Sequence, residues 1–302
     1  MMAFQWLKIH RLYKGFSMGP DVTTTYERIE QLPGDINFIY TEFDKEIRPN
    51  SDLHRYLELC CNVVERKTSL TLSESLELHH AQRILVAIVD CYKLLADAKE
   101  RSAFKGLIAQ IEATPLAPKT LGGSHGLNAV FELEFLQYLR HRNVKARLGE
   151  PDIVVSTPLG EYYIACKSIN SLNNIEANLE KAASQIAKRG VGVVALNFEP
   201  HVYYDGVMTV NDPAEVVVAL DGNASDVYKD YEPLFNRKLS AGCFDGITIQ
   251  VCCVANVVGE LTDLNTMIHN VYYLRSSIQS QDAVARFTSF WSAMRGVNSY
   301  SR

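Results

Sequence analysis

The feature that most constrains the fold is an almost unbroken apolar run from Val191 to Phe198, bounded by Gly190 and Pro200. A strand with apolar side chains on both sides of its pleat must be covered on both faces, as the central strands of α/β sheets are. An amphipathic segment precedes it, with apolar residues at helical spacing between 175 and 186. The sequence therefore predicts an α/β fold with helices packed on a sheet.

A β-hairpin is predicted earlier in the chain, in the stretch GEPDIVVSTPLGEYYIACKSI, where two extended segments flank a Thr-Pro-Leu-Gly turn. With Ser156 facing Glu161, antiparallel pairing places Asp152 opposite Ala165. Lys167 lies on the same face as Ala165 because strand side chains alternate with a period of two. A carboxylate and an ammonium are thus expected to converge at one edge of the hairpin.

The helix predicted before this hairpin, residues 127–143, decides which acid faces the same edge. An apolar arc at 3.6 residues per turn includes Glu132 among its members, which are Phe131, Phe135, Leu136 and Leu139. Glu134 falls with Gln137 and His141 on the polar side and is expected in solvent. A lone acid inside an apolar arc needs a cation or a metal, so Glu132 is a functional candidate. The alternative is a core-edge Glu132 that reaches solvent or pairs with an arginine.

These features resemble the PD-(D/E)xK nuclease superfamily, which has the restriction-endonuclease-like fold. The resemblance rests on Pro151-Asp152, the spacing to Lys167, and Glu132 on the preceding helix, and it covers about residues 121 to 200. It implies a restriction-endonuclease-like mixed sheet flanked by helices in an α/β domain of residues 119–302. A mostly helical N-terminal region, residues 1–118, is expected to precede it.

The resemblance also implies a chemistry. Asp152 and Glu132 would bind Mg²⁺, with Mn²⁺ as a substitute, and Asp152, Lys167 and Glu132 would form the catalytic set of a phosphodiesterase. The expected partner is nucleic acid, with DNA favoured, and the expected setting is defence or repair. Whether the protein forms a homo-oligomer is left open by the sequence.

The sequence departs from the family pattern at Ala165, where a Glu or Gln completes the metal site in that superfamily. Three residues are candidate substitute ligands, namely Glu161 on the same strand and Glu176 and Gln185 on the following helix. The departure keeps open an alternative, a catalytically inactive nuclease-fold protein that binds nucleic acid or a partner protein. A further alternative is an unrelated interaction protein built of helices and an α/β domain.

Composition limits the function classes. With 47% apolar and 22% charged residues, the composition is typical of a folded protein. The length of 302 residues favours two units. Its net charge of −5 gives no global basic field, so any nucleic-acid binding depends on a local patch. No apolar run approaches the roughly 20 residues of a membrane span. The seven cysteines contain no CxxC spacing, and we expect a cytoplasmic protein with reduced thiols and no membrane partner.

Outside the core motifs, residues 1 to about 50 predict turns and little else, because Gly-Pro and Pro-Gly pairs interrupt them. Ser51 is expected to cap a helix, and Thr71 with Glu74 forms a capping-box pattern ahead of one or two helices that end before Pro115. After Phe198 the sequence predicts helices at 213–218, 226–239 and 281–294 and a buried strand at 246–258.

Overall fold

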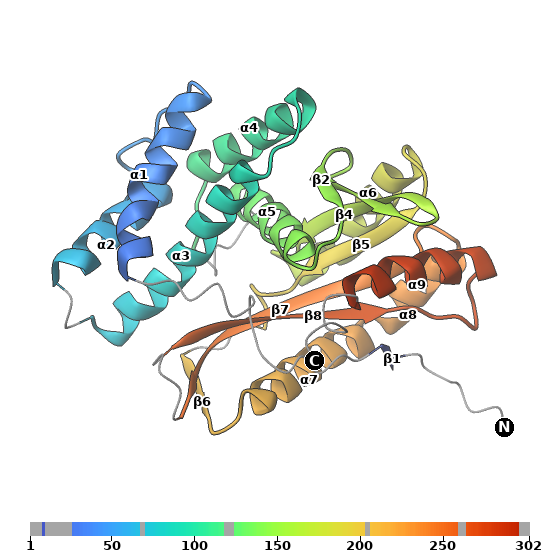
Figure 1. Ribbon diagram of the computed structural model, residues 1–302. Helices are drawn as coiled ribbons and strands as arrows, with labels where there is room; N and C mark the ends of the chain where they lie inside the picture. The colour runs from blue at the N-terminus through green and yellow to red at the C-terminus, as the bar shows by residue number, and fades with distance from the viewer. Residues whose placement is uncertain are drawn as a thin grey trace. The chain divides into compact units, whose positions relative to one another are not determined.

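The computed structural model describes residues 8–9, 26–66, 70–117, 124–202, 206–258 and 264–295. Figure 1 shows their helices and strands. The chain divides into two compact units. The helical unit lies within residues 18–138, and the sheet unit comprises residues 139–302 together with residues 1–17. The division falls inside one helix, between Tyr138 and Leu139.

The helical unit contains α1 (Tyr26–Glu42), α2 (Asp52–Arg66), α3 (Leu72–Lys93), α4 (Ala98–Ala113) and most of α5 (His125–His141). The Ser51 hydroxyl accepts a hydrogen bond from the backbone N–H of His54 at the start of α2. Thr71 and Glu74 form the predicted capping box of α3. Both helix starts are confirmed, and the stretch that ends before Pro115 consists of two helices, α3 and α4.

Helix α1 corrects the expectation of turns in the first 50 residues. It runs through Pro33-Gly34, although an internal proline removes a backbone hydrogen bond and costs about 3 kcal/mol. Its core side chains recur at helical spacing and are buried, which offsets that cost. They are Ile29, Leu32, Ile36, Ile39 and Tyr40. The apolar periodicity is present in the sequence and outweighs the Pro-Gly pair.

The described strands of the sheet unit form one eight-stranded mixed sheet in the order β1-β8-β7-β5-β4-β3-β2, with β6 beside β7. The strands are β1 (Lys8–Ile9), β2 (Ala146–Leu148), β3 (Ile153–Thr157), β4 (Gly160–Ser168), β5 (Gly192–Asn197), β6 (Val207–Val210), β7 (Gly246–Val257) and β8 (Asn265–Tyr273). Strand β5 runs parallel to both β4 and β7. All of its residues are buried, which confirms the central strand predicted from the apolar run.

The hairpin β3–β4 has the predicted register, with Ser156 paired to Glu161. Its turn is tighter than expected, because Thr157 and Gly160 already pair across it. Gly160 has φ of 108°, a value that side chains disfavour, so glycine suits the position. The Thr157 hydroxyl donates to the Gly160 carbonyl and accepts from the Leu159 N–H. These local bonds fix the register that carries Asp152 and Lys167.

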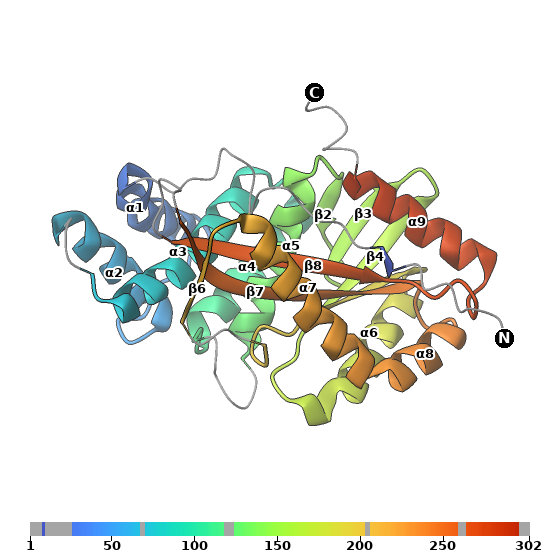
Figure 2. The same cartoon turned by 90° about the horizontal axis from the view of Figure 1, so that it is seen from below.

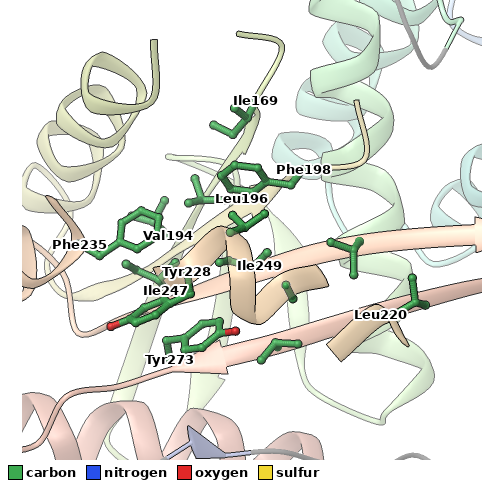
Figure 3. Packing of buried hydrophobic residues seen from close by; sticks show 14 of the residues in the cluster. Ile169, Val194, Leu196, Phe198, Leu220, Tyr228, Phe235, Ile247, Ile249 and Tyr273 are labelled. Atoms are coloured by element: carbon green, nitrogen blue, oxygen red, sulfur yellow. The ribbon is translucent and has the colours of Figure 1, made fainter. Parts of the chain in front are cut away.

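Two helical layers enclose the sheet. On one face, α6 (Ile175–Ala187) lies against β4 and β5, and α7 (Pro213–Asp230) lies against β7 and β8, as Figure 2 shows from below. Their shared apolar cluster includes Val194, Leu196, Ile247, Ile249, Tyr228, Tyr273 and Phe235 of α8 (Glu232–Ser240), labelled in Figure 3. On the other face, α9 (Gln281–Arg295) places Phe290 against Tyr162 and Tyr272.

The structure is an α/β architecture with a mixed sheet flanked by helices and a helical N-terminal region, as predicted at that level. Strands β1, β2, β6 and β8 were not predicted. The helices predicted at 213–218 and 226–239 correspond to α7 and α8, but α7 continues to Asp230 and α8 begins only at Glu232, so the predicted boundary between them is wrong. None of the helices in the described ranges is long and apolar enough to span a membrane.

Candidate functional site

Asp152 and Lys167 meet at the edge of the hairpin. Asp152 lies just before β3, in a turn in which its carbonyl oxygen accepts the Gly149 N–H. Lys167 is the penultimate residue of β4. The Lys167 Nζ lies 3.2 Å from Asp152 Oδ2. The convergence of the two side chains therefore has the geometry expected from the register, whereas their chemical roles stay predictions.

The backbone of Cys166 completes a closed set of contacts. Its N–H donates to Asp152 Oδ2 at 2.6 Å, and its carbonyl oxygen accepts from Lys167 Nζ at 2.7 Å. The Asp152 carboxylate, the Lys167 ammonium and the Cys166 backbone thus each contact the other two. Because charge-assisted bonds hold geometry better than neutral ones, the positions of the carboxylate and the ammonium are well defined.

Burial is the largest influence on the Asp152 carboxyl and raises its pKa above the ordinary value. The Lys167 ammonium and the Cys166 N–H act in the opposite direction and lower it, by less. Glu150, two residues earlier, adds a smaller increase through repulsion. The carboxylate is therefore costly to keep charged, and it depends on its cationic partner.

A pocket of about 470 Å³ opens beside Lys167 between β4 and α6. Its lining residues are Lys167, Glu180, Lys181, Ser184, Gln185 and Lys188. Glu180 is paired with Lys238 of α8. Within the described parts of the chain, neither Lys181 nor Lys188 has a carboxylate partner. The pocket therefore carries positive charge that no carboxylate among the described residues neutralises by direct pairing.

Of the three candidate substitute ligands, Gln185 lies in this pocket with Lys167. Its Oε1 atom is buried and lacks a hydrogen-bond partner in the described structure. Amide oxygen and nitrogen positions are assigned from surroundings, so this side chain offers either a donor or an acceptor to a ligand.

The other two substitutes are engaged elsewhere. Glu161 lies at the opposite end of β4 from Lys167, roughly 20 Å away at the usual rise per strand residue. Its pKa is lowered first by a hydrogen bond from the Tyr163 hydroxyl and then by Arg147. Glu176 is exposed and paired with Arg237 of α8. Both acids have surface partners of their own, and neither lines the pocket beside Lys167.

Ala165 faces the interior rather than the pocket. It is fully buried in the apolar cluster, together with Leu179, Ala182 and Ile186 of α6. In the described residues, no group of three or more His, Cys, Asp or Glu side chains is arranged to hold a metal ion. Asp152 and the Cys166 carbonyl supply two oxygen donors, so water or other ligands would have to fill the remaining positions around a Mg²⁺ ion. The predicted Mg²⁺ site stays a prediction.

Helix α5 gives a different distribution of acids from the predicted one. Glu134, expected in solvent, is buried and paired with Arg83 of α3, and Gln137 is buried and donates to Asp90. Glu134 and Gln137 are buried because α3 supplies a charged partner for each, whereas His141 is exposed as expected. Glu132 is half-buried in the helical unit. The prediction that it joins Asp152 and Lys167 stays a prediction.

Sequence reasoning missed Lys181 and Lys188. A signal was present, because these two residues and Ser184 recur at i, i+3 and i+7, which places them on one face of α6. The position of that face beside Lys167 depends on how α6 packs on β4, and periodicity does not give that. No family model, curated protein or solved structure matches the chain, so the site is interpreted from its own geometry.

Proposed function

We propose that the sheet unit is a restriction-endonuclease-like core that binds the phosphodiester backbone of nucleic acid, DNA in the first place, at the pocket beside Lys167. The observation that carries this proposal is the lining of the pocket, where three lysines gather on β4 and α6. The element order α5–β2–β3–β4–α6–β5 supports the core, since it is the helix, hairpin, helix and strand order of the resemblance with one short strand added.

Lysine ammoniums are point charges that bind phosphate oxygens, and the Ser184 hydroxyl adds a neutral donor. Asp152 offsets one of the three positive charges, the one on Lys167. Lys181 lies in α6 and Lys188 is its C-cap residue, seven residues further on and about 10 Å along the helix axis. That separation lets the two ammoniums contact different phosphates of one strand. The overall charge of −5 makes such a local patch the expected means of binding.

A second candidate function is Mg²⁺-dependent phosphodiester hydrolysis, favoured by the close approach of Asp152 and Lys167. An acid just before one strand of the hairpin and a lysine near the end of the other are the two groups of the motif that this chain retains. Hydrolysis requires further oxygen ligands for the ion, with Glu132 as the proposed contributor and Mn²⁺ as a substitute for Mg²⁺. A nuclease-fold protein that binds without cleaving requires none of these.

Fluorescence anisotropy with labelled single- and double-stranded DNA and RNA tests the binding. We expect Lys181→Gln with Lys188→Gln to weaken binding about tenfold at moderate salt and to reduce the slope of log affinity against log salt by about 2. Lys229→Gln is the matched control, because Lys229 is an exposed lysine of α7 in the same unit that pairs with Asp226. If the Lys181→Gln, Lys188→Gln double variant binds nucleic acid as tightly as the wild type does, the proposal is contradicted.

The same oligonucleotides, incubated with Mg²⁺ or Mn²⁺ and analysed on denaturing gels, separate the two functions. Metal-dependent products that disappear in Asp152→Asn indicate hydrolysis. Tight binding with intact oligonucleotides indicates a binding protein. If nucleic acid neither binds nor is cleaved, both functions are wrong.

A further inference from the structure

The Lys167 ammonium lies between two oxygen atoms that are typical ligands of a hard cation. Its Nζ is 3.2 Å from Asp152 Oδ2 and 2.7 Å from the carbonyl oxygen of Cys166. A carboxylate and a backbone carbonyl are groups that Mg²⁺ and Ca²⁺ bind in proteins. An ammonium carries positive charge and three donors, so it satisfies the same two oxygens.

We propose that the Lys167 ammonium takes the place of a divalent cation between Asp152 and the Cys166 carbonyl, and that this site engages its anionic ligand without a bound metal. The statement about the ligand rests on the proposed nucleic-acid binding. The statement about the cation does not, because metal affinity is measured on the protein alone.

Four features of the site oppose a divalent ion. The ion would displace the ammonium or lie within a few ångströms of it, and like charges at that distance repel strongly in a partly buried site. Asp152 Oδ2 already accepts a second bond, from the Cys166 N–H. Ala165 contributes no charge, so the only carboxylate contacting the ammonium in the described structure is that of Asp152. Lys181 and Lys188 add further positive charge to the adjoining pocket.

The test is a Mn²⁺ titration of the purified full chain, followed by the loss of the free-ion signal in electron paramagnetic resonance. We expect no saturable binding by the wild type at millimolar Mn²⁺. Lys167→Met keeps the length of the side chain and removes the charge, which leaves the carboxylate and the carbonyl available. Its Mn²⁺ affinity should rise by roughly tenfold or more, as expected when a like charge in direct contact is removed. Adding Asp152→Asn should abolish the gain.

Lys181→Met is the matched control, because it removes the same charge from the same pocket without a contact to Asp152. An unchanged affinity in Lys167→Met overturns the proposal, provided that circular dichroism shows the variant folded. An equal gain in Lys181→Met overturns it too, since general charge would then explain the effect. The proposal is also overturned if the wild type binds Mn²⁺ saturably and Asp152→Asn removes that binding.

A measurement on the wild type covers the case in which Lys167→Met does not fold. A lysine ammonium held by a carboxylate and a carbonyl exchanges its protons slowly, and its ¹⁵Nζ resonance becomes observable by nuclear magnetic resonance. We expect the Lys167 resonance to be unchanged by millimolar Mg²⁺, and a specific shift or loss of it overturns the proposal. Nucleic-acid affinity should be the same in EDTA as in Mg²⁺ at matched ionic strength. A failure of nucleic acid to bind at all contradicts the proposed function and leaves the metal result standing.

Discussion

The two units each contain an ion pair, and the surroundings of the pairs differ. In the helical unit, the side chains of Arg83 and Glu134 are 8% and 3% exposed and join α3 to α5. In the sheet unit, those of Lys167 and Asp152 are 16% and 9% exposed, and Lys167 lines a pocket. Both acid side chains are at most 9% exposed, and the lysine paired with Asp152 lines a pocket.

The comparison shows that a buried acid is a weak functional signal by itself. Periodicity selected Glu132 as the buried acid of α5, whereas the acid buried deepest there is Glu134, which has a structural partner on α3. The Asp152–Lys167 pair differs because Lys181 and Lys188 gather beside it without carboxylate partners in the described structure. The neighbours of an ion pair, rather than its burial, therefore separate a candidate binding site from a packing contact.

The largest expected effect on stability comes from breaking the Arg83–Glu134 ion pair of the helical unit. Glu134→Ala leaves the Arg83 guanidinium buried without this carboxylate and should lower the free energy of unfolding by about 3 to 5 kcal/mol. Chemical denaturation followed by circular dichroism measures the loss. The double variant Arg83→Met with Glu134→Leu should cost much less, because neither charge stays buried. Equal losses in the single and double variants would contradict a structural role for the pair.

The next effect tests the position of the missing family acid. Ala165→Glu inserts a carboxylate among fully buried apolar side chains and should cost about 2 to 4 kcal/mol, since it combines overpacking with burial of a charge. Ala165→Gln is the matched control for size. Recovery of stability on adding Mn²⁺ to Ala165→Glu, and not to Ala165→Gln, would show that the inserted acid reaches Asp152 and binds metal with it. If Mn²⁺ changes the stability of Ala165→Glu and Ala165→Gln equally, position 165 and Asp152 do not share a metal site.

A smaller effect is the pH dependence of stability that comes from the Asp152–Lys167 pair. Because burial raises the pKa of the folded-state Asp152 carboxyl, the folded protein holds this proton more tightly than the unfolded chain does. The stability of the wild type relative to Asp152→Asn should therefore be greatest below the ordinary aspartate pKa. It should fall as pH rises through the raised pKa, and then level off. Unfolding measured between pH 3.5 and 7 checks the sign, and an advantage that grows with pH would contradict it.

The smallest effect is expected at the surface. Glu176→Gln breaks an exposed ion pair with Arg237, and such pairs contribute less than about 1 kcal/mol. Stability and nucleic-acid affinity should both stay within error of the wild type. A marked change of nucleic-acid affinity in this variant would place Glu176 in the binding surface and weaken the distinction between the two ion pairs.

The parts of the fold that the sequence predicted are those fixed by local signals. The hairpin register follows from a two-residue turn, and β5 follows from its apolar run. Strand β8 was missed because it includes buried His269 and Asn270, so its pattern lacks clean alternation. Its pairing with β7 across the sheet determines its structure. The Asp152–Lys167 contact was predictable from register, whereas the lysine pocket depends on the packing of α6, which no local signal encodes.

The pairing of β1 with β8 has a consequence for how the chain is made. Lys8 pairs with Tyr273, so the sheet joins segments from near the two ends of the sequence. The helical unit is contiguous, within residues 18–138, and is completely synthesised while most of the sheet unit is still untranslated. On the ribosome, the helices therefore have time to assemble alone, and the early strand β1 waits until its partner β8 has been translated.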